Sequence, residues 1–259
     1  MTHDQDDTVK TILVVGVGAG DPEQLTVAAI RALNSAAVIF QLDRATSDLT
    51  RAREQLIERF VDQQPGPRLV TIAEPARDRA SEAYAEAVHD WRAGRAEVWA
   101  AAIRDELQAG QTGAFLVWGD PSLYDSTIAV LEDVLARGEV TFDFQVIPGI
   151  SSIHALTAAH RIALNRVARP VLITTGRLLT DQGWPEQVDD LVVMLDGRGA
   201  YRQVISQPAT IYWGAYLGTP DELLVSGPLA EVADEIDRLR EAARQRTGWI
   251  MDCYLLRRE

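Results

Sequence analysis

Short apolar runs alternate with longer segments in which apolar residues recur at helical spacing, from residue 8 to about residue 166. The runs are continuous and rich in β-branched residues, which is typical of strands buried on both faces of a parallel sheet. We predict strands near residues 11–15, 37–42, 68–72, 113–117 and 142–147. Because helical stretches separate them, the pattern predicts a parallel, doubly wound α/β sheet.

A glycine interrupts the helical pattern over residues 81–110. Tyr84, Val88 and Trp91 recur at helical spacing, and Gly94 then interrupts the pattern before it resumes. Glycine lowers helix stability, so this stretch predicts two helices or one helix broken at Gly94.

The pattern changes after residue 166. Asn165–Pro170 is predicted to be a linker. The apolar runs beyond it are predicted as strands at residues 171–174, 191–195, 209–213 and 249–256. The sequence therefore predicts two domains, an N-terminal α/β domain over 9–166 and a mixed α/β domain over 167–259.

Composition excludes several classes of protein. With 259 residues, 47% of them hydrophobic, the chain can build proper cores without a disulfide or metal. Cys253 is the one cysteine, which excludes a disulfide framework and a cysteine-based zinc site, and no metal is predicted. No apolar run approaches the roughly 20 residues of a membrane span, and residues 1–7 lack the features of a signal peptide. We expect a soluble, cytoplasmic protein with no membrane partner.

The formal net charge of −13 argues against nucleic acid as a partner. A protein that binds nucleic acid needs a basic face to neutralise phosphates.

Two glycine-rich loops with the same Gly-Asp-Pro ending each close an apolar run. The first is 16–22 (GVGAGDP) and the second is 118–121 (WGDP). Both are predicted at the carboxyl edge of the sheet, where open α/β folds bind ligands. Asp21 is predicted to cap a helix that has Pro22 at its first position.

The first loop partly matches the dinucleotide-binding fingerprint. Gly16 and Gly18 fit, and Asp43 closes the next apolar run, near the place of a ribose-binding acid. The position of the last glycine, however, is Asp21, whose carboxylate would repel a pyrophosphate. The loops therefore favour a neutral or cationic nucleoside, with S-adenosylmethionine as the leading candidate and an NAD-dependent dehydrogenase as the alternative.

A third motif, Pro148–Ser152 (PGISS), follows the last predicted strand of the first domain. In order and spacing, the three motifs resemble those of the class III, tetrapyrrole-type methyltransferases. The chain departs from the family pattern at Ala19, where proline is usual, and at Trp118, where glycine or serine is usual. Further stretches are similar to a deacetylating branch of the family, namely 115–127, 173–177, 213–222 and 248–252.

The resemblance implies a two-domain tetrapyrrole methylase fold, with S-adenosylmethionine in an interdomain cleft, and a homodimer. It implies methylation of precorrin-5 at C-1, coupled to loss of an acetyl group as acetate. The cofactor contacts that it implies are Ala19, Asp120, Leu123, Ser151, Ser152, Met194 and Ala215. Another precorrin methyltransferase, a diphthine synthase and a non-enzymatic ligand sensor remain alternatives.

An acidic protein needs local basic groups to hold the carboxylates of such a tetrapyrrole. Arginine binds carboxylates in bidentate fashion better than lysine does. We predict substrate contacts at Asp21, Arg44, Arg51 and Arg53. A second group of arginines surrounds the middle crossover, namely Arg161, Arg166, Arg169 and Arg177.

Acetyl loss requires water to add to a ketone carbonyl, which a general base and an oxyanion stabiliser would assist. Tyr124 follows the second glycine loop directly and is the preferred catalytic residue. The other candidates are Asp21, Asp43, Asp120 and His154.

Overall fold

The computed structural model describes residues 9–42, 47–62, 65–75, 84–248 and 250–258, without the side chains of 47–52, 84–90 and 247. The chain divides into two compact units. The first unit ends at Ile150, and the second comprises Ser151–Glu259 together with Ala19–Asp21 from the first glycine loop.

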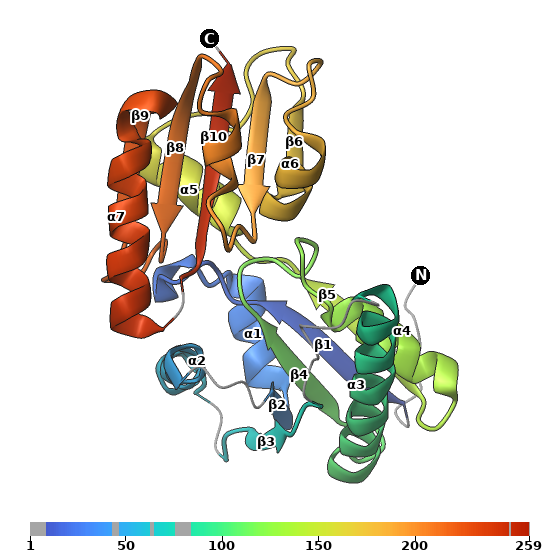
Figure 1. Ribbon diagram of the computed structural model, residues 1–259. Coiled ribbons are helices and arrows are strands. Elements are labelled where there is room, and N and C mark those ends of the chain that lie inside the picture. Colours follow the sequence, from blue (N-terminus) through green and yellow to red (C-terminus); the bar gives the residue numbers. More distant parts are fainter. Residues whose placement is uncertain (1–8, 43–46, 63–64, 76–83, 249, 259) are drawn as a thin grey trace. The chain divides into compact units, whose positions relative to one another are not determined.

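The first unit contains the predicted parallel sheet (Figure 1). Its strands, in the order β3-β2-β4-β1-β5, are β1 (Lys10–Gly16), β2 (Val38–Leu42), β3 (Arg68–Ile72), β4 (Thr112–Val117) and β5 (Phe142–Ile147). All neighbouring pairs are parallel. The connections hold η1 (Pro22–Gln24), α1 (Val27–Ser35), α2 (Ser47–Phe60), α3 (Tyr84–Glu106) and α4 (Thr127–Arg137).

Helices cover both faces of this sheet because successive side chains of a strand point to opposite faces. In β1, Ile12 and Val14 pack in one buried cluster with α3 and α4. Leu13 and Val15 pack in another cluster with α1 and α2. A strand buried on both sides is continuously apolar, which explains why these runs predicted the sheet correctly.

Two helix predictions were wrong in detail. Asp21 does not cap α1: a short 3-10 helix begins at Pro22, and α1 begins at Val27, where Thr26 Oγ1 accepts from Ala29 N at 3.1 Å. Helix α3 runs unbroken through Gly94, where a Cβ would lie 3.3 Å from Pro75 Cγ. The glycine thus permits close packing against the chain that leaves β3.

The second unit has a mixed sheet in the order β6-β7-β10-β8-β9. Its strands are β6 (Val171–Thr175), β7 (Asp190–Met194), β8 (Ala209–Ala215), β9 (Leu223–Pro228) and β10 (Asp252–Arg258). Strand β6 pairs with β7 in parallel, and the other pairs are antiparallel. The remaining elements are α5 (Ser152–His160), α6 (Gly176–Gln182), η2 (Ala200–Val204) and α7 (Leu229–Thr247).

Helix α5 accounts for the difference between the division after Ile150 and the boundary expected at 166/167. It packs on β8, β9 and β10 of the second sheet, whereas α7 packs on β8 and β9. A Cβ at Gly214 of β8 would meet Leu156 of α5, while the neighbouring Trp213 belongs to the buried cluster that includes α7. The two helices therefore cover opposite faces.

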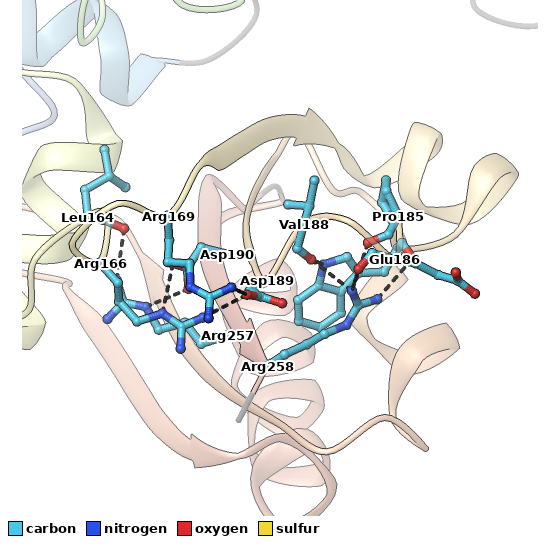
Figure 2. Close-up of polar contacts among 11 residues, drawn as sticks. Leu164, Arg166, Arg169, Pro185, Glu186, Val188, Asp189, Asp190, Arg257 and Arg258 are labelled. Carbon is cyan, nitrogen blue, oxygen red and sulfur yellow. Dashed lines mark hydrogen bonds and ion pairs between the residues drawn. The ribbon is translucent and has the colours of Figure 1, made fainter.

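The segment from α5 to β6 is held by ion pairs (Figure 2). Arg166 Nε lies 3.1 Å from Asp190 Oδ2, and Arg169 Nη1 lies 2.8 Å from Asp189 Oδ2. Arg257 Nε lies 3.1 Å from Asp190 Oδ1. Arg166 and Arg169, two of the arginines around the middle crossover, join the predicted linker to the ends of β7 and β10.

Candidate active site

Two of the glycine-rich loops pair with each other at the carboxyl edge of the first sheet. Gly18 and Gly119 form an isolated antiparallel bridge. Gly18 N donates to Gly119 O at 3.3 Å, and Gly119 N donates to Gly18 O at 2.8 Å. Val17 N also donates to Val117 O, at 2.9 Å. The edge predicted for ligand binding is therefore a fixed backbone platform.

The third loop packs against this platform without room for side chains. A Cβ at Gly149 would lie 2.2 Å from Gly119 O, and one at Gly16 would lie 2.6 Å from Gly149 N. Both distances are below 3.0 Å, and the atoms approached belong to backbone, which cannot swing aside. Glycine is required at both positions because three strand ends converge there.

Asp120 joins the second loop to the third. Its Oδ2 accepts from Gly149 N at 2.9 Å. Its Oδ1 accepts from Ser122 N at 2.9 Å and also from the Ser122 hydroxyl. Both carboxylate oxygens therefore bind protein donors, which makes Asp120 a positioning residue for the loops in addition to its predicted cofactor contact.

Tyr124 follows Leu123, whose N–H donates to Asp120 O at 3.2 Å. Tyr124 has a left-handed backbone, with φ 48°, and its side chain is 47% exposed. Such a conformation costs of order 1–3 kcal/mol in a residue other than glycine and is common at functional sites. Desolvation raises the pKa of the phenol, so at neutral pH Tyr124 can donate a hydrogen bond.

A buried arginine holds the end of the loop that carries Tyr124. Arg95 is fully buried, and its Nη1 donates to Ser126 Oγ at 2.6 Å. Its Nε donates to Glu74 Oε1 at 2.5 Å, just after β3. The guanidinium carbon lies 4.6 Å from the Trp91 ring and 4.8 Å from the Trp99 ring. Ser126, the N-cap residue of α4, makes no capping bond with its side chain.

In the second unit, three predicted cofactor residues lie at one edge of the sheet. Met194 ends β7 and Ala215 ends β8, and both strands flank the start of β10. Cys253 of β10 pairs with Met194, and its Sγ donates to Ser152 O at 3.8 Å. The structure therefore brings Ser152, Met194 and Ala215 together.

Ser151 caps α5. Its Oγ accepts from His154 N at 3.4 Å and lies 2.8 Å from His154 Nδ1. Ser151 is therefore the N-cap residue of α5, and His154 is a contact of that cap.

A buried polar network lies next to this edge. Asp252 pairs with Arg240 and accepts from Trp213 Nε1 at 2.8 Å. Burial raises the pKa of Asp252 to about 6, although Arg240 acts to lower it. Arg240 Nη2 also donates to Asp196 O at 2.5 Å, and Tyr254 Oη donates to Asp196 Oδ2 at 2.7 Å. The network ties the loop after β7 to α7 and β10.

The profile of the tetrapyrrole (corrin/porphyrin) methylases matches residues 11–233. The chain belongs to this family. It is 49% identical over 252 residues to a precorrin-6A synthase [deacetylating] of Sinorhizobium, covering 96% of each chain. The family resemblance, the α/β fold class and the assignment as a methyltransferase of cobalamin biosynthesis are thus confirmed, and the dehydrogenase alternative is set aside.

Solved structures agree with this assignment. A cobalamin synthesis related protein from Corynebacterium diphtheriae has a TM-score of 0.82 at 38% identity, over 96% of this chain and 98% of that one. A uroporphyrin-III C-methyltransferase from Thermus thermophilus, solved with S-adenosylhomocysteine, has a TM-score of 0.57 at 19% identity, over 95% and 96% of the chains. The latter likeness shows the fold. Tetrapyrrole methylases use S-adenosylmethionine, as predicted for this chain.

The substrate residues predicted for this tetrapyrrole methylase are described only in part. Arg44 and the side chain of Arg51 lie outside the described residues. Arg53 is 8% exposed on α2, so it is not an ordinary surface arginine. Asp21 is half-buried and groups with the second unit, as does Ala19.

Sequence reasoning missed Arg95 as a positioning residue. Its signal was available, because Trp91, Arg95 and Trp99 are spaced by four and so lie on one face of α3. An arginine between two tryptophans on a buried face requires an acceptor, which Glu74 and Ser126 provide.

Within the described ranges, no helix of the methylase is both long and apolar enough to cross a membrane. Nor do the described His, Cys, Asp and Glu side chains form a group that could hold a metal ion.

Proposed function

We propose that this methylase transfers a methyl group from S-adenosylmethionine to C-1 of precorrin-5 and releases the acetyl group as acetate, giving precorrin-6A. The observation that carries the proposal is the identity with the Sinorhizobium precorrin-6A synthase along almost the whole of both chains. Relatives of this chain are named as methyltransferases of other precorrins, so release of acetate is the reaction that distinguishes the proposed activity.

The chemistry of the loops fits the cofactor. Residues 16–22 and 118–121 contain no lysine or arginine, so these loops suit a nucleoside without phosphates better than a pyrophosphate. The contacts that we propose are Ala19, Asp120, Leu123, Ser151, Ser152, Met194 and Ala215. Ala215 is fully buried, so its contribution would come from the backbone.

The cofactor supplies a methyl group that is already activated on a sulfonium. Because its leaving group is neutral, the chain needs no strong acid or base for this step. The platform of Gly18 and Gly119, joined to Gly149 through Asp120, would serve to align the methyl group with the acceptor carbon. A rigid backbone suits that task better than mobile side chains do.

Acetyl loss needs more from the protein. Water adds to the acetyl carbonyl, the carbon–carbon bond to the macrocycle breaks with its electron pair passing to the macrocycle, and the acetyl group leaves as acetate. We propose that the Tyr124 phenol donates to the oxygen that becomes negative, because a tyrosine phenol, with an ordinary pKa of about 10, carries its proton at neutral pH. Its backbone strain and its partly exposed ring support this role.

The substrate contacts that we propose are Asp21 in the first glycine-rich loop and Arg44, Arg51 and Arg53 after β2. We also expect a cytoplasmic homodimer, as the family resemblance implies. Light scattering coupled to size-exclusion chromatography would measure the oligomeric state.

The deciding experiment incubates the purified chain with methyl-labelled S-adenosylmethionine and precorrin-5. Mass spectrometry should find a labelled pigment that has lost its acetyl group, together with stoichiometric acetate. Methylation of a different precorrin, without acetate, would assign the chain to another step catalysed by this family.

A further inference from the structure

A cavity of about 340 Å³ lies in the second unit, beside the carboxyl ends of the parallel neighbours β6 and β7. Side chains that line it include Arg177, Thr180, Asp181, Leu195, Asp196 and Arg198. The carboxyl ends of neighbouring parallel strands are a usual place for ligands in α/β proteins. None of the predicted cofactor contacts lines this cavity, and Arg177 belongs to the second group of arginines named from the sequence.

Asp196 fixes the wall of the cavity that follows β7. Its Oδ1 accepts from Arg198 N at 3.0 Å and Gly199 N at 2.8 Å, and its Oδ2 accepts from Ala200 N at 2.7 Å. A Cβ at Gly176 would lie 2.6 Å from Asp196 Oδ1, so α6 approaches this carboxylate directly. The Asp196 charge is therefore satisfied inside the protein and is only 4% exposed.

Asp196 is buried, whereas its neighbours Leu195 and Arg198 in this wall are exposed. Leu195 has a left-handed backbone, with φ 53°, and is 65% exposed. Arg198 is exposed, and among the residues that the structure describes no side chain or carbonyl accepts from its guanidinium. Arg177 lines the facing wall, at the start of α6. Asp181 is the remaining exposed acid, so the outward charges are mainly positive.

This local charge stands against a net charge of −13 for the whole chain. An anionic ligand gains little from the overall field and must be held by specific contacts. The exposed guanidinium of Arg198 can donate to a carboxylate without first breaking an ion pair with a described residue.

We propose that Arg177 and Arg198 bind a carboxylate side chain of the tetrapyrrole in this cavity, a proposal that rests on the proposed function. At about 340 Å³ the cavity lies at the low end of the roughly 300–1,000 Å³ found for pockets that hold drug-sized ligands, so it suits one or two carboxymethyl or carboxyethyl arms better than a whole macrocycle. Leu195 supplies an apolar contact for the edge of a pyrrole ring. The cavity is thus a specificity site for an acidic arm.

The test compares Arg198→Glu and Arg177→Glu with the unaltered chain. Because both residues are exposed, charge reversal should leave the fold intact, as circular dichroism and the melting temperature would show. We expect the KM for precorrin-5 to rise about ten-fold or more, while the Kd for S-adenosylhomocysteine stays within about two-fold. Arg198→Lys should restore part of the lost affinity.

Arg238→Glu is the matched control. Arg238 is exposed on α7, its Nε donates to Asp234 O of the same helix at 3.4 Å, and it does not line the cavity. Arg238→Glu changes the net charge by the same amount as each cavity variant, so an unchanged KM for precorrin-5 in Arg238→Glu would exclude a general charge effect. An unchanged KM in both cavity variants would overturn the proposal.

A second readout separates this proposal from the proposed function. If the unaltered chain does not methylate precorrin-5, the proposed function fails. The cavity is then judged by fluorescence titration with a uroporphyrin, which carries a carboxylate on every side chain. Weaker uroporphyrin binding by Arg198→Glu than by Arg238→Glu supports carboxylate binding in the cavity. Equal binding by the two variants overturns it.

Discussion

At the scale of single residues, Tyr124 combines a strained backbone with a phenol that keeps its proton. Methyl transfer needs alignment, whereas acetyl loss needs a donor for the developing oxyanion. Tyr124→Phe should therefore keep methyl transfer and slow acetate release, typically by about ten- to a thousand-fold for the loss of such a donor. A methylated, still acetylated pigment should accumulate, and its mass would identify it.

The ratio of labelled pigment to acetate over time is the measurement that decides. Release of both products in step at the rates of the unaltered chain would show that Tyr124 has no role. An equal fall in both rates would instead place Tyr124 in substrate binding.

Asp120 has a different kind of importance, because both its oxygens bind neighbouring loops. Asp120→Ala removes the bond to Gly149 N and those to Ser122 together. We expect the affinity for S-adenosylhomocysteine and the free energy of unfolding each to fall by about 1–3 kcal/mol. Calorimetry and urea titration measure the two quantities.

Ser122→Ala is the control, since it removes only the hydroxyl that Asp120 Oδ1 accepts from and keeps the bond to Gly149. Its effect should be clearly smaller. Full cofactor affinity in Asp120→Ala would show that the loop junction is not needed for binding.

The sequence located these residues but did not reveal what each one contacts. Gly-Asp-Pro predicted a tight turn at a strand end, and the turn is there. The bond from Asp120 to Gly149 joins loops that are 29 positions apart, so no local pattern contains it. The same holds for the left-handed backbone of Tyr124, which surrounding contacts impose on an ordinary side chain.

At the scale of elements, the convergence of three strand ends makes Gly149 intolerant of any side chain. The Cβ of Gly149→Ala would meet the backbone of the second loop and of β1. We expect a loss of about 3 kcal/mol or more in the free energy of unfolding, together with weaker binding of S-adenosylhomocysteine. Gly197→Ala is the comparison, because a Cβ at Gly197 would meet no atom within 4 Å. Equal stability of the two variants would contradict the packing described.

Prediction of elements succeeded where burial dictates the pattern. The continuous apolar runs of the first sheet matched its strands closely because both faces are covered. Strand β9 was missed, since it lies at the edge of its sheet and alternates exposed with buried positions before Gly227 and Pro228. The start of α1 was misplaced because Pro22 opens a single 3-10 turn, and Thr26 is the actual cap.

At the scale of the whole molecule, stability should depend on pH through Asp252. Burial raises the pKa of this carboxyl from 3.8 to about 6, so between these values the folded protein binds more protons than the unfolded chain. The free energy of unfolding contributed by Asp252 is therefore greatest below pH 4 and falls as pH rises to 6, by roughly 2 kcal/mol.

Urea titrations of the unaltered chain and of Asp252→Asn across pH 4–7 would measure this contribution. Asparagine keeps an acceptor for Trp213 and Arg240 but does not titrate. The difference in free energy between the two proteins should change over this window. A constant difference would show that Asp252 ionises alike in both states.

Whole-molecule charge explains why the arginines were hard to assign from sequence. Clusters at residues 161–169 looked suited to an acidic substrate, yet Arg166 and Arg169 neutralise Asp190 and Asp189. Arg258 likewise donates to the carbonyl oxygens of Trp184, Pro185, Glu186 and Val188. Which arginines serve the fold depends on contacts distant in sequence, and the composition does not contain that information.

The thiol of Cys253, the one cysteine of this methylase, can report local opening of the second sheet. Cys253 is 3% exposed between β7 and β8, and burial raises its pKa to about 12, so a disulfide reagent should not react with it in the closed state. Labelling then requires the edge of the sheet near Ser152 to separate, and its rate measures how often that happens. S-adenosylhomocysteine should slow the labelling if it bridges α5, β7 and β8, without any substitution being introduced.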